Sequence, residues 1–161
     1  MAQTEKKRWL FRARVVDRAG ALTSITSVFS SRGISLDTVA GHGAEHAATG
    51  EGTVLVSFRS TEREKNVMRR LVERLSKVHS VEEHPYLAEH LRKSALLRVA
   101  PGLEPADVIG HNTTLTCELV DEDSRGKLYF IAGSPAQVDP VIERLKSAGV
   151  LSDVVYSVCA L

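Results

Sequence analysis

One pattern of elements, strand–helix–strand–strand–helix–strand, organises residues 9–86 and limits the fold more than any other feature of the chain. Apolar and basic side chains alternate over residues 9–16, which predicts a strand with one buried face. A turn at 17–20 precedes a helix over 21–32, which Gly33 ends. The remaining segments are a strand at 34–39, a loop rich in Gly, Ala and His at 40–52, a strand at 53–58, a helix capped by Ser60 or Thr61, and a short strand at 78–86.

This order is that of a ferredoxin-like unit, in which two helices cover one face of a four-stranded antiparallel sheet. Residues 87–161 repeat the order imperfectly, because Pro101, Gly102 and Pro105 leave room for only one or two turns of the first helix. We therefore predict an α+β chain of two ferredoxin-like (βαββαβ) units. The predicted domains are 1–86 and 87–161, and the second is degenerate with a shortened first helix.

Composition and spacing add expectations about the cores. Aromatic residues make up only 5% of the chain, which predicts aliphatic cores. The second helix of the first unit should bury Val67, Leu71 and Leu75, which recur at helical spacing, with Met68 and Val72 beside them. Cys117 and Cys159 are expected to be small buried side chains without a disulfide. In the second half we predict a strand over 112–120 and a polar turn over 121–126.

Charge and hydropathy exclude several classes of protein. The content of 43% apolar and 25% charged residues is typical of a folded globular chain. The net charge of +1 argues against a dedicated nucleic-acid binder. Crossing a membrane takes about 20 apolar residues, and the sequence has no such stretch. Two arginines interrupt the first apolar run, so we expect neither a secretory signal nor a membrane partner but a cytoplasmic protein.

The small net charge hides an asymmetry between the two halves. Residues 1–85 contain 14 Lys and Arg against 10 Asp and Glu, whereas residues 86–161 contain 7 against 10. Much of the basic excess lies in one segment, residues 63–77. This segment is either a solvated helix face or a contact with an acidic partner or between the halves.

The turn between the first strand and the first helix is a candidate binding site. Helix N-terminal N–H groups attract carboxylates, Gly20 lets a ligand approach the backbone, and Asp17 can accept hydrogen bonds from an ammonium group. Together these groups would suit an amino acid. A plain capped turn is the simpler interpretation of the same residues.

Two histidines, His42 and His46, lie four residues apart in the Gly-rich loop. They could serve as acid, base or metal ligands, with Asp17 as a further acid or base. The neighbouring glycines, however, disfavour a helix in this loop. A pair of histidines without a function is the simpler interpretation. The sequence contains no nucleophile elbow, phosphate-binding loop, dinucleotide fingerprint or Cys–Cys metal pair. We therefore expect no catalytic residue, metal or cofactor in this chain.

Residues 15–22, Val-Val-Asp-Arg-Ala-Gly-Ala-Leu, and 28–37, Val-Phe-Ser-Ser-Arg-Gly-Ile-Ser-Leu-Asp, resemble an ACT domain. More narrowly, they resemble the small regulatory subunit of acetolactate synthase. That family has N-x-x-G-A-L followed by F-S-x-R-G-[YF]-N-I-[DE]-S-L in these places. Residues 115–161 are similar to the C-terminal domain of the same family.

The resemblance implies a regulatory protein rather than an enzyme. Members of the family bind a branched-chain amino acid, usually valine, where two ACT domains meet in a homodimer. They also control a large catalytic subunit that holds thiamine diphosphate. Asp17 and Ser35 stand where the family has Asn, which changes the donors and acceptors offered to a ligand. The positions implied in ligand binding are Asp17, Arg18, Ala19, Gly20, Ala21, Leu22, Ser35 and Leu36.

Three functional hypotheses follow. The leading one is a regulatory subunit that binds an amino acid or a related metabolite and controls a partner enzyme. The second is a small divergent enzyme that uses Asp17, His42 or His46 in the same pocket. The third is an adaptor that keeps only the surface for a catalytic subunit.

Overall fold

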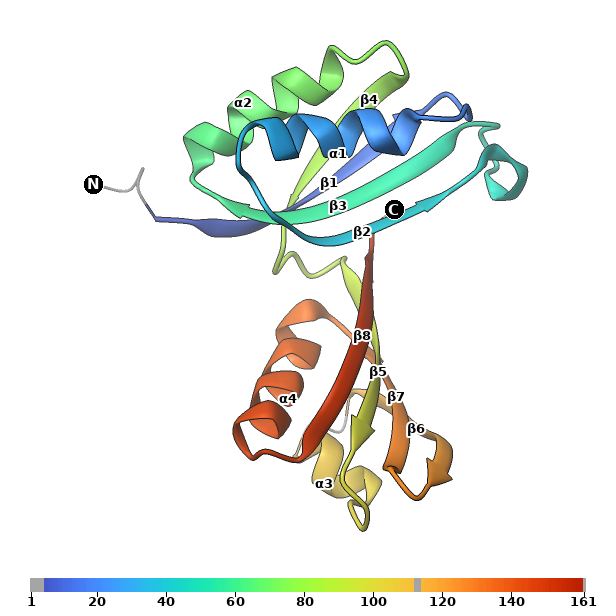
Figure 1. The fold of residues 1–161 in the computed structure, drawn as a ribbon, viewed down its shortest axis with the longest axis vertical. Helices are drawn as coiled ribbons and strands as arrows, with labels where there is room; N and C mark the ends of the chain where they lie inside the picture. Colours follow the sequence, from blue (N-terminus) through green and yellow to red (C-terminus); the bar gives the residue numbers. More distant parts are fainter. Residues whose placement is uncertain (1–4, 112–113, 161) are drawn as a thin grey trace. The chain divides into compact units, whose positions relative to one another are not determined.

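The computed structural model describes residues 5–111 and 114–160 and divides into two compact units, which separate after Ala88. Each unit is an antiparallel four-stranded sheet with two helices, and Figure 1 shows the helices of each unit on one face of its sheet. The predicted α+β fold of two ferredoxin-like units is thereby confirmed. No helix in these described ranges is long and apolar enough to span a membrane.

The N-terminal unit follows the predicted order of elements. Its sheet has the strand order β2-β3-β1-β4, so β2 and β4 are its edge strands. The elements are β1 (Lys7–Val15), α1 (Ala21–Ser31), β2 (Leu36–His42), the 3-10 turn η1 (Ala44–His46), β3 (Gly52–Ser60), α2 (Glu62–Glu73) and β4 (Val78–Pro85). The strand β2 runs through residues predicted as loop, because Ala40 to His42 pair with β3 despite the glycine among them.

The core of this unit is aromatic at its centre, so the prediction of an aliphatic core is wrong. The rings of Phe11 and Phe29 each lie edge-on to that of Phe58, with centroids 4.8 Å apart in both pairs. All three side chains are buried between the helices and the sheet. Three of the chain's eight aromatic residues meet here, which an average composition does not reveal. Valine, alanine and isoleucine side chains complete the cluster.

Helix α2 begins at a capping box and buries the predicted face only in part. Thr61 accepts the N–H of Glu64 through its hydroxyl, and the Glu64 carboxylate accepts the N–H of Thr61. Met68 and Val72, which were predicted beside the core residues, are buried together with Lys65. Of the three predicted core residues, Leu71 and Leu75 are partly buried against the core and Val67 is 37% exposed. Lys65 can face the sheet because its ammonium meets a carboxylate there.

The C-terminal unit has the strand order β6-β7-β5-β8 and the predicted short first helix. Its elements are β5 (Arg92–Val99), α3 (Pro105–Ile109), β6 (Thr116–Asp123), β7 (Gly126–Gly133), α4 (Pro135–Ser147) and β8 (Leu151–Cys159). Residues 112–113 of the predicted strand 112–120 lie outside the described residues.

Two details of this unit differ from the predictions. The strand β6 continues to Asp123, so the turn after it is shorter than predicted. The Asp123 carboxylate forms an ion pair with Arg98 on β5 at 3.1 Å. Cys159 is exposed and Cys117 half-buried, and both are free thiols, so the expected burial is wrong for Cys159. Burial raises the pKa of the Cys117 thiol above its ordinary value.

Candidate functional site

The turn after β1 delivers the chain to the N-terminus of α1. Gly20 is the N-cap residue with φ of +84°, a left-handed conformation that glycine adopts without the cost of a Cβ. Lys77, which follows α2, stabilises the turn by a hydrogen bond, because its Nζ donates to the carbonyl oxygen of Ala19 at 2.8 Å. The turn is therefore held in one conformation by a glycine and by a cation that follows α2.

The first turn of α1 has open N–H groups. No side chain caps this helix at Gly20, and its first turn contains no acidic residue. Within the described residues, the N–H groups of Leu22 and Thr23 have no hydrogen-bond partner. This contrasts with α2, whose N-terminus is closed by its capping box. The N-terminus of α1 can therefore accept an anionic group from outside the unit.

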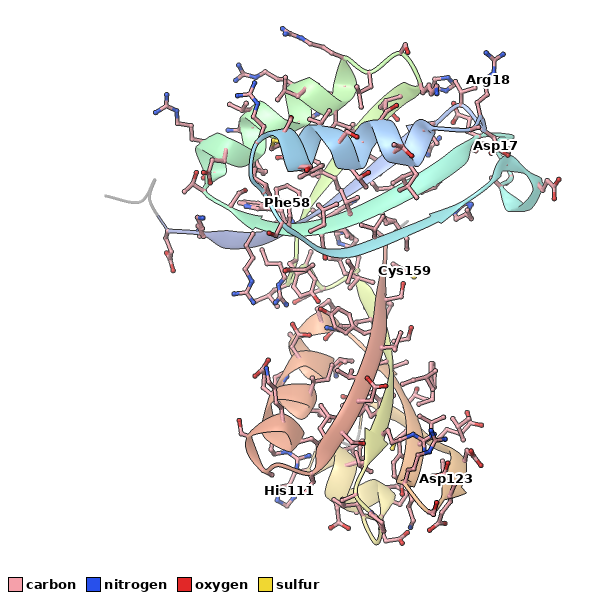
Figure 2. All side chains as sticks on the ribbon, in the orientation of Figure 1. Asp17, Arg18, Phe58, His111, Asp123 and Cys159 are labelled. Atoms are coloured by element: carbon pink, nitrogen blue, oxygen red, sulfur yellow. The ribbon has the colours of Figure 1, made fainter. Side chains whose placement is uncertain are left out.

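Asp17 has a partner that the sequence did not indicate. Its Oδ2 accepts the N–H of Ala44 at 2.8 Å, which fastens η1 to the turn after β1. A Cβ on Gly43 would lie 2.9 Å from the same oxygen, so the glycine makes room for the carboxylate. Figure 2 shows Asp17 at the same end of the sheet as η1, with Arg18 pointing outward from that end. The second carboxylate oxygen of Asp17 has no hydrogen-bond partner among the described residues.

A hollow of about 240 Å³ lies between this turn, the end of β2 and the start of β3. Its wall combines valine side chains with the Asp17 carboxylate and glycine backbone. The lining residues are Val15, Val16, Asp17, Arg18, Ala21, Leu22, Gly41, His42, Gly43, Gly52, Thr53 and Val54. The hollow is smaller than a typical pocket for a drug-sized ligand, which suits a compact molecule with one apolar and one charged part.

Ser35 and Leu36 lie far from this hollow within one copy of the chain. Leu36 pairs with Phe58 near one end of β3, whereas His42 pairs with Thr53 near the other. Six strand steps separate them, which amounts to roughly 20 Å. The structure thus brings four of the predicted residues to the hollow, namely Asp17, Arg18, Ala21 and Leu22. Ala19 and Gly20 belong to the same turn but do not line the hollow, and Ser35 and Leu36 lie at the opposite end of β2.

The histidines occupy different positions. His42 lines the hollow, and its Nδ1 lies 3.3 Å from the carbonyl oxygen of Gly43. The backbone of His46 lies in η1, and its side chain is outside the described part of the structure. Among the described residues, no three His, Cys, Asp or Glu side chains converge as a metal site.

A charged cluster adjoins the hollow on the side of β4. Glu51 lies directly before Gly52 and hydrogen-bonds to Nδ1 of His79. This hydrogen bond, with a smaller contribution from the charge of Arg14 at 3.7 Å, lowers the pKa of the Glu51 carboxyl below its ordinary value of 4.5. The carboxylate is therefore ionised over the whole neutral range.

Several residues of the hollow could not be identified from the sequence. Gly41, Gly43 and Gly52 come from the segment interpreted as a loop, and Thr53 was predicted only as the start of a strand. Lys77 gave no local signal, since it lies 58 residues from the carbonyl that it holds. The residues that close the site are therefore set by sheet pairing rather than by a local motif.

Comparisons with known proteins identify a similar fold. No family model matches the chain, and no curated protein matches it significantly. The solved structure of the small subunit of acetolactate synthase from Thermotoga maritima has a TM-score of 0.70 at 15% identity, covering 96% of each chain. The likeness indicated by residues 15–37 is therefore also present in the fold, over nearly the whole chain. The ligand-free regulatory subunit of aspartate kinase from Thermus thermophilus has a TM-score of 0.48 at 12% identity, covering 92% of this chain and 99% of that one.

Proposed function

We propose that the chain is a non-catalytic regulatory protein that binds a small amino acid where two N-terminal units meet along β2. The observation that carries this proposal is the position of the expected binding residues at the two ends of one edge strand. Val39, the middle residue of β2, is 42% exposed on that edge. An open edge strand with an exposed apolar residue at its centre favours pairing with another strand.

Antiparallel pairing of two β2 strands about Val39 would complete the site. Under that symmetry Leu36 of one copy lies opposite His42 of the other. Ser35 and Leu36 of one copy would then approach the hollow of the second copy. The pairing would form two equivalent sites from residues that one copy keeps apart.

The chemistry of the hollow favours a zwitterion with an aliphatic side chain. The open N–H groups of α1 suit a carboxylate, and the free oxygen of Asp17 suits an ammonium group. The side chains of Val15, Leu22 and Val54 offer apolar contacts. This division also keeps the ligand carboxylate away from Asp17, which would repel it.

Regulation would follow from linkage between the ligand and the arrangement of the dimer. A ligand that contacts both copies stabilises the paired arrangement, and a partner that distinguishes the arrangements responds to the ligand. The similar structure from Thermotoga maritima is named as a small subunit of acetolactate synthase. We therefore propose that the partner is a larger catalytic subunit, for which a thiamine diphosphate enzyme is the first candidate.

Sedimentation of the protein with and without valine tests the pairing. We expect a dimer that valine strengthens, and we expect the Val39→Asp variant to be monomeric because charges on adjacent edges repel. Val120→Asp is the matched control, since Val120 is 51% exposed on β6, the corresponding edge strand of the other sheet. A Val39→Asp protein that stays dimeric, or a wild type that is monomeric at all concentrations, would contradict the proposal.

The acid–base alternative rests on His42, which lines the same hollow. A catalytic histidine usually has a carboxylate or another group that orients its ring. The ring of His42 meets a backbone carbonyl, and no hydrogen bond joins it to a carboxylate of the described residues. The regulatory function is therefore better supported.

A further inference from the structure

We propose that the exposed face of α2 is a docking surface for an acidic amphipathic helix of a partner protein. This inference rests on the proposed function in one respect, since that function supplies a reason for a partner. The surface itself is separate from the hollow at the turn after β1. The surface lies in the basic segment 63–77, for which the sequence allowed either a solvated helix face or a contact with an acidic partner or between the halves.

Four residues form one stripe along α2 and its C-cap, and we call them the arginine stripe. They are Arg63, Val67, Arg70 and Arg74, at relative positions 0, 4, 7 and 11, and all four are exposed. Eleven residues of helix span about 16 Å. Figure 2 shows nitrogen-tipped side chains projecting outward from α2. The stripe therefore presents three cations and one apolar side chain along three turns of helix.

The cations of the stripe lack the partners that neighbouring cations have. Lys65 pairs with Glu83 at 2.8 Å, and Arg69 pairs with Glu73 at 2.9 Å. Arg63, Arg70 and Arg74 have no ion pair or hydrogen bond among the described residues. The carboxylates of Glu64, Glu73 and Glu83 are thus engaged by other groups, and among the described residues none of them contacts an arginine of the stripe.

The surface beside the stripe is hollowed, and its lining is mostly polar with a few apolar side chains. A hollow of about 580 Å³ is lined by Arg63, Asn66, Val67 and Arg70 together with Glu62. A second hollow of about 440 Å³ shares Arg63 and Val67, and its other lining residues are Arg32, Ile34, Thr61, Glu64 and Met68. Arginines around a small apolar group, Val67, Ile34 and Met68, fit an amphipathic helix that has carboxylates beside a narrow apolar stripe.

The chemistry favours a protein segment over other anionic partners. No aromatic side chain stands among these lining residues to stack on nucleic-acid bases. The exposed apolar part is one valine between arginines, far less than the apolar face with which helices enter a membrane surface.

This chain offers no suitable helix of its own among the described ones. Helix α1 has no acidic residue, and on α4 Asp139 pairs with Lys93, which leaves Glu143. Helix α3 has five residues, and a second α2 would present the same arginines. The occupant is therefore a segment of another protein.

Fluorescence anisotropy with a labelled synthetic helix tests the proposal. The probe is an 18-residue peptide with glutamate and leucine arranged as one stripe, and a scrambled peptide of equal composition is its control. We expect Arg63→Gln/Arg70→Gln to weaken binding of the ordered peptide about fivefold or more at low salt. The matched control Arg125→Gln/Lys146→Gln removes the same charge from exposed positions of the other unit and should leave binding within about twofold.

The proposal is overturned if the scrambled peptide binds equally well, if both double variants lose the same affinity, or if the ordered peptide does not bind. Tighter binding to phosphatidylglycerol vesicles or to duplex DNA overturns it too. So does self-association that is lost in Arg63→Gln/Arg70→Gln. Stabilisation of the same proteins by amino acids is measured in parallel. Peptide binding without such stabilisation counts against the proposed function alone, and stabilisation without peptide binding counts against the docking surface alone.

Discussion

The buried ion pair between α2 and β4 should respond unequally to removal of its two members. The Nζ atom of Lys65 lies 2.8 Å from Glu83 and 4.5 Å from the centre of the Trp9 ring, and the lysine side chain is 5% exposed. The Glu83 side chain is 28% exposed and has Arg69 at 3.6 Å as a second cation. Glu83 therefore keeps a partner and some water when Lys65 is replaced, whereas Lys65 keeps only an aromatic ring when Glu83 is replaced.

This difference sets the expected magnitudes. Leaving a buried charge unpaired costs about 3–5 kcal/mol, so we expect Glu83→Leu to lower the free energy of unfolding by about 3 kcal/mol. Lys65→Met should cost about 1 kcal/mol, because methionine keeps the apolar contact with Trp9 and Glu83 keeps Arg69. The double variant should lie within about 1 kcal/mol of the wild type, since well-packed apolar residues often replace a buried pair without loss.

Urea unfolding followed by tryptophan fluorescence measures this directly. Trp9 is the single tryptophan of the chain and lies beside the pair, so its signal reports the N-terminal unit. With a slope of about 1–3 kcal/mol per molar urea, a difference of 2 kcal/mol moves the midpoint by roughly 1 M. Glu73→Leu, which removes an exposed pair with Arg69, is the control and should cost less than about 0.5 kcal/mol. A Lys65→Met protein as unstable as Glu83→Leu would refute the reasoning.

Three further predictions concern the turns and the charged cluster. Gly126→Ala should destabilise the C-terminal unit by roughly 3 kcal/mol. Gly126 has a φ of +122°, and a Cβ there would lie 2.0 Å from the carbonyl oxygen of Val99. Hydrogen exchange of the strands of this unit measures the loss. Asp17→Ala should speed exchange of the first amide of η1 about tenfold, since it removes the carboxylate that accepts this N–H; unchanged exchange would contradict the assigned contact. The folded pKa of Glu51 is depressed, so its stabilisation is complete above its unfolded value of 4.5 and is lost as pH falls through the lower folded value. An NMR titration should show this pKa below 4.5 in the wild type and nearer to 4.5 in His79→Gln.

The sequence predicts those parts of the fold that depend on local patterns. The alternation in β1, the glycines that bound α1 and the short α3 all follow from periodicity and turn chemistry, and the structure confirms them. These features need only neighbours along the chain. Repetition of the same order then predicts the second unit.

Features set by contacts between distant segments were missed. The glycine-rich end of β2 becomes strand only because β3 lies beside it. The sequence did not distinguish Lys65 from the other cations of the basic segment, because its carboxylate partner is 18 residues away. The partner of Asp17 is 27 residues away, and no local rule indicates it. At the candidate site, the sequence therefore located the turn but not the residues that close the hollow.

The central claim is that two N-terminal units together bind a small amino acid. Thermal unfolding followed through Trp9, with each of the twenty amino acids in turn, tests it most directly. Ligand at about 100 times its Kd adds about 2.7 kcal/mol, which raises Tm by roughly 10 °C or more in a unit of this size. We predict such a rise with at least one aliphatic amino acid, and its absence in Val39→Asp. If none of the twenty raises Tm, or if Val39→Asp gains the same stability as the wild type, the account is contradicted.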